Sequence, residues 1–194
     1  MSEPLDPPAR ILTVCTHNRT RSVMMAALLQ SMLDDRLGDG AAAVRSAGFV
    51  AEGLPPIDDA VAAMRRRGLD VSAHRSGLVT PALLDGADLV VTAEREHVVR
   101  IATLSPAAFG RAMTLPELLE RAAADGPENP DLRAWVERLT AERTAGAYLR
   151  ELVAEVADPT GSSSRAFEQA VVDIERRCAD LSTLLTHVLR RRTG

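Results

Sequence analysis

The stretch Ile11–Ser22 has the sequence Ile-Leu-Thr-Val-Cys-Thr-His-Asn-Arg-Thr-Arg-Ser. Its opening residues are apolar or β-branched, which predicts a short buried strand over Ile11–Val14. Ser22 is a favourable helix N-cap, and the apolar spacing in Val23–Leu37 is typical of an amphipathic helix. The stretch therefore predicts a cysteine at the end of a strand and an arginine at the start of a helix, with a tight loop between them.

Such a loop is suited to bind an oxyanion. Backbone N–H groups of the loop and of the first helical turn point to a common centre, where the helix dipole adds positive potential. Arg21 supplies a planar fork of donors that matches a tetrahedral oxyanion. Cys15 in such surroundings ionises more readily than a free cysteine, and a thiolate beneath a bound phosphate is a nucleophile directed at phosphorus. The alternative is a structural Cys15 in the core beside solvated arginines; the flanking strand and helix favour the catalytic interpretation.

Several short motifs follow this loop along the chain. Ser46-Ala47-Gly48 follows a second expected strand, His74-Arg75 comes later, and Ala87-Asp88-Leu89-Val90-Val91 contains most of a third. Asp158-Pro159 precedes a long last helix. With these motifs in this order, most of the chain resembles the low-molecular-weight protein tyrosine phosphatases and the arsenate reductases of the same fold.

The alternation of strands and helices predicts an α/β protein, a three-layer αβα sandwich around a short parallel sheet of about four strands. In such sheets ligands bind beyond the carboxyl ends of the strands, which is where Cys15 is expected. The expected strands are Ile11–Val14, Ala42–Ser46, Asp88–Thr92 and Ala112–Thr114. The expected helices are Val23–Leu37, 58–67, a short one from Pro81, Glu94–Thr103, two or three within 116–153, and Ser164–Leu189.

The length of 194 residues suits a single domain over 1–194, with a flexible tail at 1–9. Residues 116–153 are predicted to form a helical insertion, broken at Gly126-Pro127 and Asn129-Pro130. The insertion is either a solvated elaboration or a lid or partner surface over the loop, including a contact between copies of the chain.

Net charge, apolar runs and cysteine content limit the classes of protein to which this chain can belong. A net charge of −4 gives no indication of nucleic-acid or anionic-membrane binding. No signal-like segment opens the sequence, and no apolar run reaches membrane-spanning length, so we expect a cytoplasmic protein. The two cysteines, Cys15 and Cys178, make no disulfide framework, and Cys178 falls on the apolar stripe of the last helix as an inert core thiol.

The resemblance implies three catalytic residues. Cys15 is the nucleophile that carries the phosphoryl group as a phosphocysteine, and Arg21 stabilises the charge on the phosphoryl oxygens. Asp158 donates a proton to the leaving group and later deprotonates the attacking water. Read locally, Asp158-Pro159 is also an ordinary turn dipeptide. No metal and no cofactor are called for.

The resemblance also implies how the loop is held. Asn18 tolerates a left-handed backbone conformation and is tied to Ser46 and His74, while Ser22 hydrogen-bonds the thiolate. The remaining substrate-binding positions are those of the loop backbone, so that the expected set is Thr16, His17, Asn18, Arg19, Thr20 and Ser22.

The sequence departs from the family pattern at informative positions. Thr20 replaces the second cysteine that many of these phosphatases carry in the loop. Thr160 stands where an aromatic residue usually follows Asp-Pro. Phe49 is a candidate for one aromatic wall of the substrate slot, and the other wall is missing unless Trp135 or Tyr148 swings in. Phosphotyrosine preference is therefore open.

Two further residues with metal-binding side chains are spaced one helical turn apart. Glu94 and His97 could share a metal, but without a second such pair a surface ion pair is the simpler expectation.

Three functions fit these observations. The first is a phosphomonoesterase acting on a phosphorylated protein or a small phosphoester. The second is an arsenate reductase that uses Cys15 and a small external thiol, because the chain lacks the further cysteines of an internal disulfide relay. The third is a module that binds a phosphate or a phosphoprotein without turnover.

Overall fold

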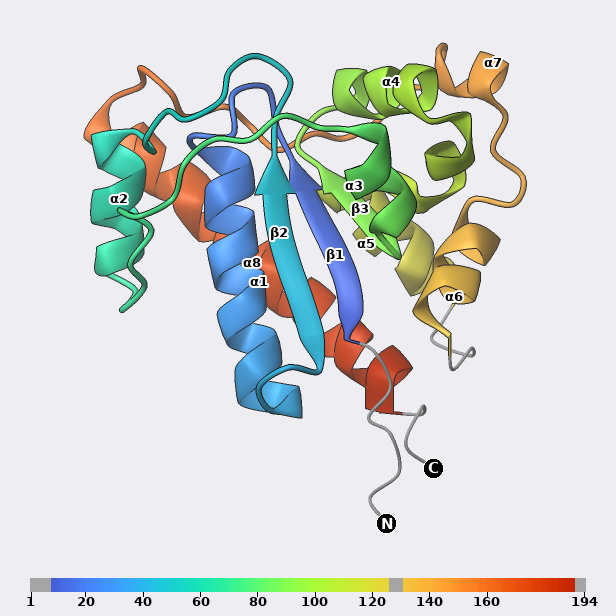
Figure 1. Cartoon of the computed structure of the whole chain (residues 1–194), viewed down its shortest axis with the longest axis horizontal. Coiled ribbons are helices and arrows are strands. Elements are labelled where there is room, and N and C mark those ends of the chain that lie inside the picture. The colour runs from blue at the N-terminus through green and yellow to red at the C-terminus, as the bar shows by residue number, and fades with distance from the viewer. Residues whose placement is uncertain (1–7, 126–130, 191–194) are drawn as a thin grey trace.

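The computed structural model describes residues 8–125 and 131–190, and its centre is a four-stranded parallel sheet (Figure 1). The strand order is β2-β1-β3-β4, and every pairing is parallel. The strands are β1 Ala9–Val14, β2 Ala42–Ala47, β3 Leu89–Thr92 and β4 Ala112–Thr114. Helices cover both faces, which confirms the predicted three-layer α/β architecture.

The helices follow the order expected from the sequence. They are α1 Arg21–Leu37, α2 Asp58–Arg65, α3 Pro81–Gly86, α4 Arg95–Leu104, the 3₁₀ helix η1 Pro106–Arg111, α5 Leu115–Asp125, α6 Leu132–Leu139, α7 Ala145–Tyr148 and α8 Ser164–Arg190. No helix within the described parts of the chain is both long and apolar enough to cross a membrane.

The alternation of side chains along β1 divides the core into two halves. Ile11 packs with buried residues of α1 and α8 on one face, whereas Leu12 and Val14 pack with residues of α3 and α4 on the other. Apolar side chains are buried on both faces of β1 because helices cover both, as expected for a central strand of a parallel sheet. Cys15 follows at the carboxyl end of this strand, and its N–H donates to the carbonyl of Ala47 on β2.

Several boundaries differ from the prediction. The predicted tail extends too far, because Ala9 is buried and already belongs to β1; residues 1–7 lie outside the described part of the chain. Ser22 does not cap α1: the helix begins at Arg21, and the side chain of Ser22 points to the loop. The helix expected over 58–67 ends at Arg65.

The insertion is packed into the body of the protein. Trp135 and Tyr148 are 0% and 1% exposed, so neither can swing toward the loop, and that suggestion was wrong. Trp135 joins the core on the α1 and α8 side, and Tyr148 joins the core beneath α4. The predicted breaks at Gly126-Pro127 and Asn129-Pro130 lie within 126–130, outside the described residues.

A buried ionic cluster fastens the insertion to the sheet. Arg143 donates to a Glu117 carboxylate oxygen at 3.1 Å and to the Ala112 carbonyl at 2.8 Å. Its guanidinium lies 4.2 Å from the centroid of the Phe109 ring and 4.6 Å from that of Tyr148, whose hydroxyl donates to Glu117. Burial lowers the pKa of Arg143 and raises that of Tyr148. Because both charges are desolvated, the cluster depends on each partner being present.

Candidate active site

The loop between β1 and α1 lies at the edge of the sheet where the strands end, at the top of Figure 1. Cys15 opens the loop and is 3% exposed, at the level of the core. Its Sγ lies 3.0 Å from the Ser22 Oγ, which also accepts a hydrogen bond from the Asn18 side-chain amide at 3.0 Å. With Asn18 as donor, the hydroxyl hydrogen of Ser22 is left to donate to the sulfur, which stabilises a thiolate.

Asn18 fixes the shape of the loop. Its φ of 53° is the only positive value among the non-glycine residues that the structure describes. The Gly77 N–H donates to its side-chain oxygen at 2.9 Å, and His74 Nε2 donates to its carbonyl at 3.0 Å. Ser46, the other predicted partner, has no hydrogen bond to Asn18 among the described residues; the Gly77 backbone and Ser22 take the side-chain contacts instead.

Gly48 lets the loop pass close to the neighbouring strand. A Cβ added there would lie 2.8 Å from the Asn18 nitrogen and 2.9 Å from the Thr16 carbonyl oxygen. Both contacts are with backbone atoms, so the loop itself would have to move. The glycine of the Ser46-Ala47-Gly48 motif is therefore required by close approach of two backbone segments.

Arg21 is held from two sides. It is 3% exposed, and its Nη1 donates to a Glu94 carboxylate oxygen and, at 3.1 Å, to the Val156 carbonyl. Its Nη2 donates to Asp158 Oδ2 at 3.0 Å. The structure thus brings Cys15, Arg21 and Asp158 to one edge of the sheet, as the sequence predicts, and adds Glu94, which the sequence reasoning placed in a surface pair.

Asp158 lies on the segment that crosses back over the loop after the insertion. The Val156 N–H donates to the Ala93 carbonyl at 2.8 Å, which anchors this segment to the end of β3. Asp158 Oδ1 accepts from the Thr160 N–H at 3.0 Å, and the Thr160 hydroxyl lies 3.4 Å from that of Thr20 in the loop. Asp158 therefore takes part both in a local turn with Thr160 and in the contact with Arg21.

Glu94 and His97 are not a surface ion pair, which corrects the prediction. His97 is 1% exposed, its Nδ1 accepts from the Glu94 N–H at 3.1 Å, and its Nε2 lies 3.0 Å from the Thr16 hydroxyl. Burial lowers the pKa of His97 to about 4, and the nearby Arg21 and Arg100 act in the same direction. The spacing of Glu94 and His97 predicts a shared helix face, but nothing in it indicates that this face meets the loop.

Phe49 lies beside the loop, next to Thr16. The Phe49 N–H donates to the Thr16 carbonyl at 2.7 Å, so the backbone of this residue borders the loop. Its ring stacks on His97 with centroids 5.7 Å apart, and the Arg100 guanidinium lies 4.1 Å from its centroid. Arg19 is turned aside, because its Nε donates to the Pro55 carbonyl at 2.7 Å, while His17 is exposed.

Cys178 is separated from this chemistry. It is 1% exposed within the core formed with α1, and burial raises the pKa of its thiol to about 12. Within the described residues no group of three or more His, Cys, Asp or Glu side chains is placed to hold a metal ion.

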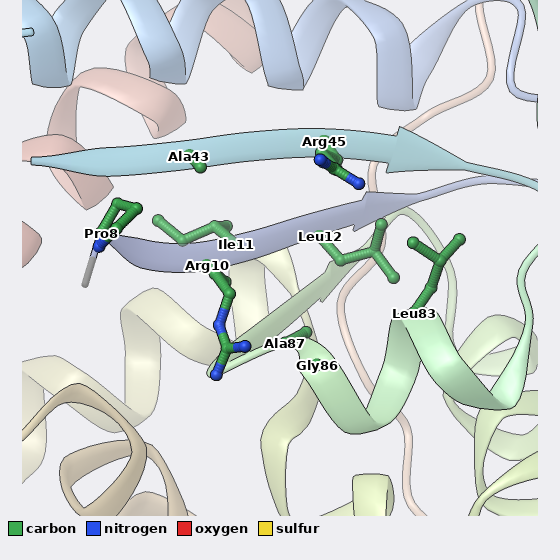
Figure 2. A pocket seen from close by; sticks show the side chains of 9 residues that line it. All are labelled: Pro8, Arg10, Ile11, Leu12, Ala43, Arg45, Leu83, Gly86 and Ala87. Carbon is green, nitrogen blue, oxygen red and sulfur yellow. The ribbon is translucent and has the colours of Figure 1, made fainter. Parts of the chain in front are cut away.

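A separate cavity of about 350 Å³ lies against β1, β2 and α3 (Figure 2). Arg10, Leu12 and Arg45 line it together with Leu83 of α3. It contains no residue of the loop at Cys15, so the two are distinct surfaces.

Comparison with known proteins points to one family. Residues 10–133 match the family described as low molecular weight phosphotyrosine protein phosphatase. The probable low-molecular-weight protein-tyrosine-phosphatase EpsP of Ralstonia nicotianae is 35% identical over 130 residues, covering 66% of this chain and 85% of that protein. An arsenate reductase of Bacillus licheniformis is 40% identical over 82 residues, covering 42% of this chain and 54% of the reductase.

The structure of the YwlE arginine phosphatase from Geobacillus stearothermophilus is also similar, with a TM-score of 0.68 and 26% sequence identity. The match covers 92% of this chain and 93% of that one. The fold and these likenesses define a cysteine phosphatase. The chain belongs to the low-molecular-weight phosphotyrosine protein phosphatase family.

Proposed function

We propose that the protein hydrolyses phosphomonoesters through a phosphocysteine formed on Cys15. The observation that carries this proposal is the position of the Cys15 sulfur, 3.0 Å from the Ser22 hydroxyl at the start of the loop between β1 and α1. Arg21 and Asp158 are paired at the same site. A nucleophile, an anion clamp and a carboxylic acid are the three groups that displacement at phosphorus requires.

The reaction proceeds in two displacements. The Cys15 thiolate attacks phosphorus, an S–P bond forms, and the bond to the leaving oxygen breaks while Asp158 gives that oxygen a proton. Water then attacks the phosphocysteine, Asp158 takes a proton from it, and the thiolate leaves. Arg21 and the loop N–H groups hold the phosphoryl oxygens in both steps, and Ser22 stabilises the thiolate each time it is released.

The residues that border the loop and the names of the relatives support a substrate class. EpsP is named as a probable protein-tyrosine phosphatase and YwlE as an arginine phosphatase, and these names make phosphorylated protein side chains candidate substrates for this protein. Phe49 is the aromatic residue bordering the loop, and Thr160 replaces a second aromatic wall. We propose a phosphorylated protein side chain or a small phosphoester as the substrate.

The test is a panel of substrates assayed with the purified protein. p-Nitrophenyl phosphate, phosphotyrosine and phosphoarginine peptides are compared, and Arg21→Ala is assayed beside the wild type. We expect turnover by the wild type and a loss of at least about 100-fold in the variant. An absence of turnover on every phosphorylated compound would overturn the proposal.

The same panel includes arsenate with a small thiol. Cys178 is buried against α1 and cannot relay a disulfide from Cys15, so arsenate reduction would require an external thiol. Arsenate-dependent thiol oxidation without phosphoester turnover would identify a reductase instead.

A further inference from the structure

His97 lies behind the loop, with both of its ring nitrogens engaged. Nδ1 accepts from the Glu94 N–H at 3.1 Å, and Nε2 lies 3.0 Å from the Thr16 hydroxyl oxygen. One face of the ring is stacked on Phe49, with an interplanar angle of 17°. Because His97 is 1% exposed, no water competes for these contacts. The ring is therefore fixed in position by three separate elements: the start of α4, the loop, and the segment after β2.

The bonding pattern decides where the protons lie. A nitrogen that accepts from a backbone N–H carries no hydrogen, so the neutral ring is protonated at Nε2. Nε2 then donates to the Thr16 oxygen, and the hydroxyl hydrogen of Thr16 is left free to donate elsewhere. Of the charged groups around the ring, Arg21 and Arg100 disfavour a second proton and Glu94 and Asp158 favour it, while burial disfavours it most.

We propose that His97 is a positioning residue that orients the Thr16 hydroxyl as a donor to the phosphoryl oxygens bound in the loop. This inference rests on the proposed phosphatase function. A donor whose orientation is set before the reaction stabilises developing charge without reorganising, and it adds to the loop N–H groups and Arg21. The same ring holds the Glu94 backbone at the start of α4, where the Glu94 carboxylate meets Arg21.

A purely structural role for His97 makes a different prediction. In that case the residue caps α4 and fills the core, and its replacement lowers stability without acting through Thr16. The two roles are separated by substitutions that remove one of the two hydrogen bonds at a time.

The variants are chosen for the atoms that they retain. In His97→Asn the amide oxygen can still accept from the Glu94 N–H, but the shorter side chain does not reach Thr16. In His97→Gln an amide N–H can take the place of Nε2 as the donor. Thr16→Val removes the hydroxyl and keeps the shape, and Thr103→Val makes the same change on the exposed face of α4 as a matched control.

The measurements are kcat/KM for p-nitrophenyl phosphate, the Kd for inorganic phosphate, and stability to urea. We expect His97→Asn and Thr16→Val each to lower kcat/KM about tenfold and to weaken phosphate binding, with no further loss in the double variant. His97→Gln should recover most of the activity, and Thr103→Val should leave it unchanged.

Additive losses in the double variant would overturn the proposal, and so would a His97→Asn protein that is less stable but fully active. The affinities for inorganic phosphate distinguish a failure of this inference from a failure of the proposed phosphatase function. If the wild type hydrolyses nothing, the phosphatase proposal fails, while matched weakening of phosphate binding in His97→Asn and Thr16→Val still tests whether the two residues act together.

Discussion

Arg21 and Asp158 form an ion pair at the loop, with Nη2 of the arginine 3.0 Å from Oδ2 of the aspartate. The Arg21 side chain is 4% exposed and that of Asp158 is 50% exposed, so the pair joins a fixed cation to a carboxylate at the surface. A phosphoryl group that binds Arg21 competes with Asp158 for the same donor. The other nitrogen, Nη1, stays anchored by Glu94 and the Val156 carbonyl.

The first prediction concerns Asp158→Ala. Removing the carboxylate frees a donor of Arg21, so inorganic phosphate should bind several-fold more tightly, as measured by titration calorimetry. Turnover of both substrates should fall. The fall should be larger for phenyl phosphate, about 100-fold or more, than for p-nitrophenyl phosphate, because the poorer leaving group depends more on receiving a proton. Equal losses on both substrates would show that Asp158 is not the acid.

The second prediction concerns the close approach at Gly48. Gly48→Ala places a methyl group within 3.0 Å of loop backbone atoms, so the loop must shift and kcat/KM should fall about tenfold or more. Gly86→Ala is the matched control, because a Cβ there meets nothing within 4 Å. Steady-state kinetics measure kcat/KM of the two variants. Equal values would contradict the claim that close approach of the backbone requires a glycine at position 48.

The third prediction concerns pH. The pKa of His97 is about 4 in the folded protein against 6.5 for a free histidine, so the unfolded chain binds one more proton between these values. The free energy of unfolding should therefore fall as the pH drops from about 6.5 to about 4, by the order of 3 kcal/mol in total. Urea denaturation at about pH 7 and about pH 5 measures the fall.

His97→Asn is the control for that measurement. It lacks the titrating ring, so its stability should depend less steeply on pH over the same interval. Parallel pH dependences of the two proteins would show that His97 is not the group responsible.

The fourth prediction concerns the ionic cluster that holds the insertion. Glu117→Ala leaves the fully buried Arg143 side chain without its carboxylate and should cost about 3–5 kcal/mol of stability. Asp173→Ala removes the carboxylate that Arg176 and Arg177 share near the surface and should cost much less. Urea denaturation measures the free energy of unfolding of both variants. Similar losses would mean that the buried ion pair stabilises the protein no more than the surface pairs do.

The sheet and the loop could be predicted from the sequence because their signals are local. The apolar run at Ile11–Val14 and the three expected strands after it all lie within the observed sheet, apart from Asp88, which precedes β3. Asn18 has the left-handed conformation that its short amide side chain tolerates. His74 reaches the Asn18 carbonyl as the family resemblance implies.

What the sequence did not reveal depends on contacts between distant segments. Glu94 and His97 have the spacing of any exposed helix pair, and only the packing of α4 against the loop gives them partners in Arg21 and Thr16. Ser22 has the side chain of a helix cap, and the resemblance implies its contact with the Cys15 sulfur, but the hydrogen bond that it accepts from the Asn18 amide was not predicted. Local propensity describes neither case, because tertiary contacts decide both.

The role of the insertion was open for the same reason. Trp135 could be read as a residue of a lid, and the structure places it in the core instead. The hydrogen bonds that this part of the chain makes to Arg21 and Thr20 come from residues 156–160, beyond the predicted insertion. The sequence pattern does not distinguish a polar side chain on the surface from one at a site, because the difference depends on which distant segments lie beside it in the fold.

The most direct test of the central claim is to trap the phosphocysteine. Wild type and Asp158→Ala are mixed with p-nitrophenyl phosphate, quenched rapidly with acid and analysed by mass spectrometry of the peptide that contains Cys15. We predict that one phosphoryl group appears on Cys15 and accumulates further in Asp158→Ala, because hydrolysis of the intermediate is slowed, and that Cys15→Ser gives no turnover. Full turnover by Cys15→Ser, or a phosphoryl group on another residue, would contradict the account.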